Sequence, residues 1–104
     1  MTMNVLELRY LIRSAMTNKQ LVDFFYEGQY VLGEPQIYGI MVNEIHLLIY
    51  QLSGQNNSEY LPKWRDTRAE NISNLRLLRY HFQGRRVNWI KSHDKFDKVL
   101  ESVK

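Results

Sequence analysis

The residues with the clearest chemical potential are eight bases between positions 63 and 91. Six of the eight are arginine, and only Asp66 and Glu70 oppose them in that stretch. Arginine presents a planar fork of N–H donors that binds phosphate at two points. Residues 1–62 carry a net charge of −3 and residues 63–104 a net charge of +6. This asymmetry indicates an anionic partner, and the alternative is a solvated face with scattered ion pairs.

Other kinds of chemistry find little support in the sequence. The chain has no cysteine, which excludes disulfides, thiolate metal sites and thiol nucleophiles. The three histidines, His46, His81 and His93, are not spaced as a metal-binding pair. The five glycines form neither a dinucleotide-binding motif nor a P-loop. We therefore expect a protein that is not an enzyme and that uses no cofactor and no metal.

Apolar spacing predicts the elements that must position these residues. Three- and four-residue steps predict a helix over 4–18, with Asn4 as its N-cap, and another over 94–103. Alternating apolar residues predict short strands between positions 20 and 52. The stretch from Trp64 to Phe82 fits a helix or a strand equally well, and periodicity does not decide between them.

The order of helix, strands and helix predicts a mainly β fold of the α+β class. We expect a small antiparallel β-barrel with a helix at each end, formed by one domain over residues 1–104. Its parts are an N-terminal helix (1–19), a barrel (20–82) and a C-terminal helical tail (83–104). The predicted core consists of Leu8, Leu11, Val22, Phe24, Tyr26, Leu48, Tyr50, Ile72, Leu75, Phe96 and Leu100.

The composition argues against a secreted or membrane protein. Charged Glu7, Arg9 and Arg13 interrupt the apolar residues near the N-terminus, which argues against a signal peptide. No apolar run approaches the roughly 18 residues that a membrane span requires. Together with the absence of cysteine, this predicts a cytoplasmic protein.

An ordered series of segments resembles the WYL domain family in its small stand-alone form. The family's namesake tripeptide is absent, Thr67 stands where the family usually has phenylalanine, and Asn71 stands where it usually has arginine. The matching segments are Val22-Asp23-Phe24-Phe25-Tyr26-Glu27-Gly28, Val31-Leu32-Gly33-Glu34-Pro35, His46-Leu47-Leu48-Ile49-Tyr50-Gln51 and Trp64-Arg65-Asp66-Thr67-Arg68-Ala69-Glu70-Asn71-Ile72.

This resemblance implies an Sm-like or SH3-like barrel that senses a ligand, often a nucleic acid or a nucleotide, in bacterial transcriptional regulators. It also favours a strand for Ile72–Leu78. The N-terminal helix alone is too little for a helix-turn-helix. The chain would then be a ligand-binding or regulatory module that does not itself recognise operator DNA.

The resemblance places Arg65 and Arg68 on the strand that contacts the ligand. With Lys63, Tyr50 and Trp64 they form the predicted binding site, in which the aromatic rings would stack on bases. An odd spacing directs Arg65 and Arg68 to opposite sides of a regular strand, so a bulge or bend would have to bring them together. The alternative for the arginines is an ion pair with Glu34 or Glu70, and the alternative for each aromatic ring is the barrel core.

Two functions are compatible with these observations. The first is a non-catalytic module that binds single-stranded nucleic acid or a nucleotide through its basic second half. The second is an accessory subunit that binds a regulatory protein or a second copy of itself, with no nucleic-acid ligand. An exposed sheet edge could mediate such a homodimer. The salt dependence of oligonucleotide binding separates the two, because phosphate contacts weaken steeply as salt rises.

Overall fold

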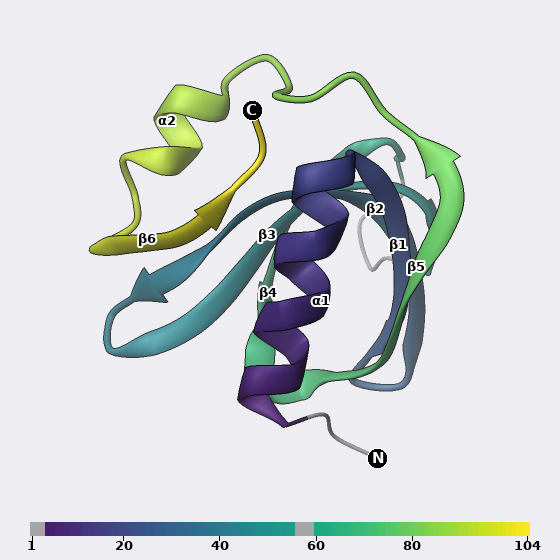
Figure 1. Ribbon diagram of the computed structural model, residues 1–104, viewed down its shortest axis with the longest axis horizontal. Helices are drawn as coiled ribbons and strands as arrows, with labels where there is room; N and C mark the ends of the chain where they lie inside the picture. Colours follow the sequence, from purple (N-terminus) through teal and green to yellow (C-terminus); the bar gives the residue numbers. More distant parts are fainter. Residues whose placement is uncertain (1–3, 56–59) are drawn as a thin grey trace.

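The computed structural model describes residues 4–55 and 60–104 and shows a mainly antiparallel β-sheet with two helices (Figure 1). No helix in these two ranges is both long enough and apolar enough to cross a membrane. The elements, in chain order, are α1 (Val5–Asn18), β1 (Gln20–Tyr26), β2 (Gln29–Met41), β3 (Glu44–Gly54), β4 (Lys63–Arg68), the 3-10 turn η1 (Ala69–Asn71), β5 (Ile72–His81), α2 (Trp89–His93) and β6 (Lys98–Ser102).

Helix α1 begins at the predicted cap and buries one face. The side chain of Asn4 accepts a hydrogen bond from the backbone N–H of Leu6 at 2.8 Å, which confirms the N-cap. Leu8, Ile12 and Ala15 are buried, as the helical spacing predicts. In Figure 1 the helix stands between β4 on one side and β1 and β5 on the other. It therefore covers the concave side of a bent sheet.

Strand β1 shows how alternation sets the two faces of the sheet. Val22, Phe24 and Tyr26 point into the core and are at most 7% exposed. A two-residue turn then leads into β2, and both of its residues have positive φ, 51° at Glu27 and 82° at Gly28. This geometry matches the twist of a hairpin, and glycine adopts it without steric cost.

The sheet is bent but open. Its strand order is β4-β3-β2-β1-β5, and within the described residues no pairing joins β4 to β5. The α+β class and the antiparallel pairing are confirmed, whereas a closed barrel is not what the pairing shows. The unpaired edges of β4 and β5 leave a gap in the sheet. Near this gap a side chain links β1 to β4: the hydroxyl of Tyr26 accepts a hydrogen bond from the backbone N–H of Arg68 at 3.1 Å.

Strand β2 changes partners part-way along its length. One edge of β2 pairs with β1 as far as Gly33. Farther along the chain, the same edge pairs with β6 from Ile37 to Ile40. The register against β3 also shifts on both sides of this switch. Residues 34–36 therefore lie where neither β1 nor β6 covers them. The segment between β5 and α2 passes over this point, at the top of Figure 1.

The prediction of a helix over 94–103 is wrong. The only helix in this tail is the short α2, and β6 follows it as a strand antiparallel to β2. Pairing with β2 determines the conformation: the backbone N–H of Val103 donates to the carbonyl of Gln36 at 3.1 Å, and Val103 is fully buried. The strand reading of the ambiguous stretch is confirmed, because β5 covers Ile72–His81.

Most of the predicted core is buried. Leu8, Val22, Phe24, Tyr26, Leu48, Ile72 and Leu75 are all in the buried cluster. Leu11, Phe96 and Leu100 pack against it and are only partly buried. Tyr50 is also only partly buried, because its ring lies on the outer face of the sheet.

An ion-pair group ties α1 to β6 and predicts a loss of stability in acid. Arg9 and Arg13 each donate to Glu101 at 2.8 Å. The hydrogen bond from Arg13 is the largest cause that holds the pKa of Glu101 below its usual value. A lowered folded-state pKa means that Glu101 contributes stability above its unfolded pKa of about 4.3. That contribution is lost as pH falls through the folded-state pKa.

Thermal unfolding of Glu101→Gln therefore tests this contribution. At pH 7 the variant is expected to melt at a lower temperature than the parent protein. The difference should shrink as pH falls below about 4.3, because Glu101 then gains a proton on unfolding and its contribution to stability declines toward zero. A difference that is the same at pH 7 and pH 3 would contradict the assignment.

Candidate anion-binding site

Arg65 and Arg68 lie on opposite faces of β4, as their spacing predicts, and no bulge brings them together. The guanidinium of Arg65 lies 5.2 Å from the ring centre of Tyr26. It donates to the side-chain oxygen of Gln29 at 2.9 Å and to that of Gln51 at 3.2 Å. These acceptors are neutral, so Arg65 works as a positively charged cross-link over the gap in the sheet.

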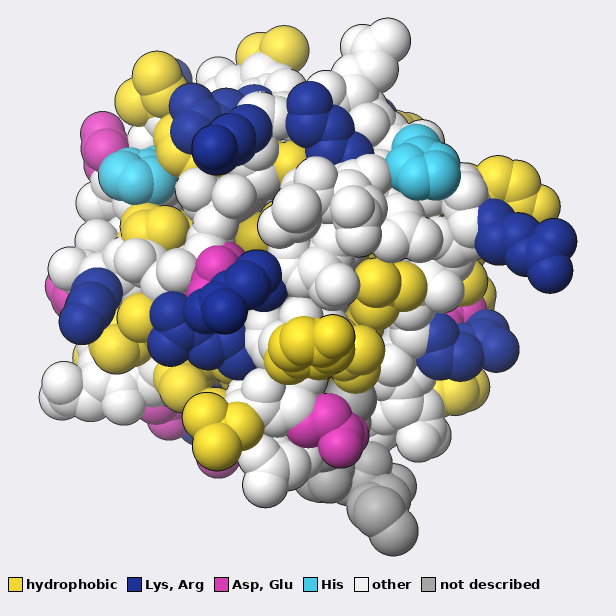
Figure 2. Space-filling model, viewed as in Figure 1, with side chains coloured by type: hydrophobic (Ala, Val, Ile, Leu, Met, Phe, Trp, Pro, Cys, Tyr) yellow, Lys and Arg dark blue, Asp and Glu magenta, His cyan; other side chains and the backbone are white. Residues whose placement is uncertain are grey.

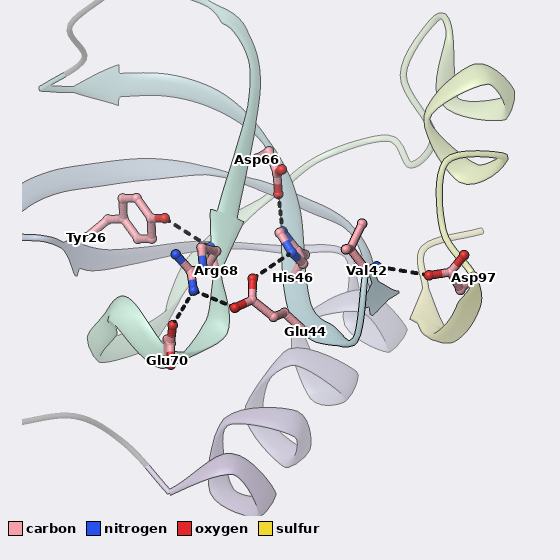
Figure 3. A network of polar contacts seen from close by, with 8 residues as sticks. All are labelled: Tyr26, Val42, Glu44, His46, Asp66, Arg68, Glu70 and Asp97. Atoms are coloured by element: carbon pink, nitrogen blue, oxygen red, sulfur yellow. Dashed lines mark hydrogen bonds and ion pairs between the residues drawn. The ribbon is translucent and has the colours of Figure 1, made fainter.

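Arg68 belongs to a separate network of charged groups (Figure 3). Its Nη2 donates to Glu44 at 2.5 Å and to Glu70 at 2.7 Å. The hydrogen bond to Glu44 raises the pKa of Arg68. His46 lies beside the same group, 2.7 Å from Asp66. Two carboxylates thus neutralise Arg68, and its expected partner Glu70 is confirmed while Glu34 is engaged elsewhere.

The other three predicted site residues do lie together. Tyr50 and Trp64 are direct partners across β3 and β4, with ring centres 5.7 Å apart in an edge-to-face arrangement. With Lys63 they line a shallow hollow of about 320 Å³. The remaining wall of this hollow is formed by residues 86–88, which follow β5, and not by Arg65 or Arg68.

A buried polar pair on β2 fixes the segment from 82 to 88. Glu34 and Gln36 are 3% and 0% exposed, at the point where β2 changes partners. The side-chain amide of Gln36 donates to the carbonyl of Gly84 at 3.1 Å, and its oxygen accepts from the backbone N–H of Arg86 at 3.2 Å. A Cβ on Gly84 would lie 2.4 Å from a backbone oxygen of Lys104, at a φ of 131°, so only glycine fits this close approach.

Arg86 is the central residue of this segment. Its Nε and Nη2 donate to the two oxygens of Glu34 at 2.7 and 2.6 Å, a bidentate pair. The hydrogen bond to Glu34 raises the pKa of Arg86. The guanidinium also lies 4.4 Å from the ring centre of Tyr50. Its position is therefore fixed on two sides, while its other N–H groups remain for a further acceptor.

A second hollow lies on the other side of Arg86. It has a volume of about 450 Å³ and is lined by Leu21, Glu34, Leu52 and residues 81–87. Arg85 contributes to its wall and donates from Nε to the carbonyl of Val103 at 3.0 Å. The guanidinium of Arg85 packs 3.8 Å from the ring centre of Trp89. Since a carbonyl is a neutral acceptor, this contact leaves the charge of Arg85 uncompensated.

The charge around the two hollows is positive. Residues 79–91 contain Arg79, Arg85, Arg86 and Lys91 and no acid. In Figure 2 the basic side chains of one face form separate groups, several of them beside acidic side chains. The groups at the top of that view lie over α2 and the segment that leads into it. The basic stretch without acids therefore lies at this end of the molecule, whereas on β4 Arg68 lies beside Glu44 and Glu70.

Sequence reasoning did not place Arg86 or Glu34 in the site. The signal for Arg86 was present, because adjacent arginines follow a glycine in a stretch without acids. What the sequence did not reveal is that Glu34 pairs with Arg86, 52 residues away.

Within residues 4–55 and 60–104, no group of three His, Asp or Glu side chains is arranged to hold a metal ion.

Comparison with known proteins gives no family for this chain. No protein-family model matches it, and no curated protein or solved structure matches it significantly. The resemblance to WYL domains therefore rests on the residues of the sequence and stays a prediction.

Proposed function

We propose that this protein is a non-catalytic module that binds the phosphate groups of a nucleic acid or a nucleotide between β3, β4 and the segment 82–88. One observation carries the proposal. Arg86 is held rigidly by the buried Glu34 and lies between two open hollows, with aromatic rings on one side and Arg85 on the other. A fixed guanidinium loses little conformational freedom when it binds phosphate.

The chemistry of the two hollows suits the two parts of a nucleotide. Tyr50 and Trp64 offer apolar ring surface, on which a base can stack. Arg85 and the free N–H groups of Arg86 offer charge-assisted donors for phosphate oxygens. In this proposal Lys63, Tyr50 and Trp64 keep the role that the sequence assigned to them. Arg85 and Arg86 take the role assigned to Arg65 and Arg68.

The resemblance to WYL domains supports a regulatory, ligand-sensing role in the cytoplasm. The bent sheet behind an N-terminal helix, with its gap spanned by Tyr26 and Arg65, supports an Sm-like or SH3-like fold whose closure uses side chains. On this proposal the ligand binds outside the gap, and β4 contributes its Lys63 end.

Binding of a short labelled oligonucleotide at low and high salt tests the proposal. Arg85→Ala is expected to weaken binding about three- to tenfold at low salt and to flatten the salt slope by about one unit. Arg85→Ala also removes the contacts with Val103 and Trp89, so binding is compared per folded molecule after the stability of the variant has been measured. Lys95→Ala is the matched control: it removes one exposed charge that lines neither hollow.

The competing function is association with a protein, including a second copy. It is favoured by β5, which within residues 4–55 and 60–104 pairs only with β1, on one edge, and in which Tyr80 is 71% exposed. Absence of oligonucleotide binding at low salt, together with a concentration-dependent change in molecular mass, would replace the first function with this one.

A further inference from the structure

The outer face of the sheet carries a second group built like the first. On β1 the core residues alternate with Leu21, Asp23 and Phe25, which point the other way. Asp23 lies directly opposite Arg76 of β5. The side chain of Asp23 is only 3% exposed, because neighbouring side chains cover it.

Arg76 and Tyr30 together hold this buried carboxylate. Arg76 donates from Nε and Nη2 to the two oxygens of Asp23 at 3.0 and 2.6 Å, and the hydroxyl of Tyr30 donates to it at 2.8 Å. Burial raises the pKa of Asp23, but these hydrogen bonds lower it by more, so the carboxylate is ionised at neutral pH. The guanidinium of Arg76 is thereby fixed although its side chain is 70% exposed.

An aromatic pair and a hollow complete the group. The rings of Phe25 and Tyr30 meet edge to face with centres 5.8 Å apart. They line a hollow of about 490 Å³ with Asp23, Arg76 and Asn74. Phe25 is 42% exposed. Asn74 has a φ of 56° and lies at a register shift between β1 and β5, where the strand bends.

The two groups repeat one arrangement. Each has a buried carboxylate, an arginine bound to it through both oxygens, and an aromatic pair beside an open hollow. The first consists of Glu34, Arg86, Tyr50 and Trp64, and the second of Asp23, Arg76, Tyr30 and Phe25. An ion pair that only stabilised the fold would not need an aromatic pair and a hollow beside it. Because both groups have all of these features, we expect both to bind the same kind of ligand.

The hollow beside Arg85 lies between the two groups in the order of the strands. It is lined by Leu21 of β1 and Glu34 of β2, and Leu21 precedes Asp23 on the same face of β1. The three hollows therefore follow one another across β4, β3, β2, β1 and β5. Strands roughly 4.8 Å apart place Trp64 and Arg76 about 19 Å apart along the curved face.

We infer that this outer face is a continuous track for an extended single-stranded nucleic acid, with stacking positions at Trp64 and Phe25 and phosphate positions at Arg86 and Arg76. The inference rests on the proposed function and adds the second group and the polymeric nature of the ligand. A mononucleotide reaches one group only. A duplex keeps its bases stacked on one another and offers no base face to the rings.

Oligothymidylates of about 3 and about 12 nucleotides distinguish the track from a single site. We expect Phe25→Ala to weaken binding of the longer oligonucleotide about tenfold and to leave binding of the shorter one unchanged. Arg76→Lys should act in the same direction, since lysine keeps the charge but loses the fork. Tyr10→Ala is the control, because it removes an exposed aromatic ring from α1 instead.

A longer oligonucleotide with abasic sites provides a test that does not depend on protein variants. It should bind the parent protein at least as weakly as the normal longer oligonucleotide binds Phe25→Ala, because the abasic sites remove stacking at both Trp64 and Phe25. If the parent protein binds both normal lengths equally well, or if Phe25→Ala weakens both lengths equally, the track is excluded while the first site survives. If neither length binds at low salt, the proposed function fails and the track with it.

Discussion

Replacing Phe24 with alanine is expected to lower the free energy of unfolding by about 3–5 kcal/mol. Phe24 is 1% exposed and belongs to the central buried cluster. Its removal would leave a cavity among β1, β2 and α1 that the bent sheet cannot close without breaking strand pairs. Urea denaturation followed by circular dichroism measures the effect.

The neighbouring residue supplies the matched control. Phe25 has the same side chain, one position along the same strand, but it is 42% exposed. Phe25→Ala should therefore cost no more than about 1 kcal/mol. Equal losses for the two variants would mean that the two faces of β1 are wrongly assigned.

Removing the guanidinium of Arg86 is expected to cost about 2–4 kcal/mol. Loss of one partner from a fully buried ion pair costs about 3–5 kcal/mol, because it leaves an uncompensated buried charge. The side chain of Glu34 is 4% exposed, but that of Arg86 is 43% exposed, so water relieves part of this cost. Arg86→Ala and the parent protein can be compared by chemical denaturation at pH 7.

A second substitution separates the buried charge from lost packing. Adding Glu34→Gln to Arg86→Ala removes the unpaired carboxylate and should restore a large part of the lost stability. Arg68→Ala is the control, because Glu44 and Glu70 are 48% and 65% exposed and such pairs contribute about 1 kcal/mol or less. If Arg68→Ala is the more damaging of the two, the importance given to Glu34 is wrong.

Local pattern was sufficient for the elements whose partners are close in the chain. Alternation over Val22, Phe24 and Tyr26 and the Glu27–Gly28 turn specify the first hairpin by themselves. The tail was different. Phe96, Val99, Leu100 and Val103 fit a helical face, yet Val99 lies opposite Gly39 in the sheet. Only the exposed edge of β2, 60 residues earlier in the chain, makes a strand the better solution.

In the candidate site, too, contacts between neighbouring strands were predictable from the sequence, whereas contacts between distant residues were not. The arginine-rich second half directed attention to residues 63–91, and the pairing of β3 with β4 brings Tyr50 and Trp64 together. Which arginine faces the rings depends on Glu34, and Glu34 is available only because β2 changes partners beside it. No spacing within the sequence encodes that event, so Arg65 and Arg68 were the natural choice.

The pairing of β6 with β2 also sets an order of events during synthesis. Helix α1 and the strands as far as β5 can pair as soon as residue 81 has left the ribosome. The segment 82–88 then still lacks Val103, whose carbonyl holds Arg85 and whose N–H binds Gln36. Because these contacts need residues 98–103, a nascent chain pairs β1 to β5 before the segment 82–88 is fixed. The hollow beside Arg85 would thus take its final form only after residues 98–103 have emerged, whereas the pair of Asp23 and Arg76 forms with the first strands.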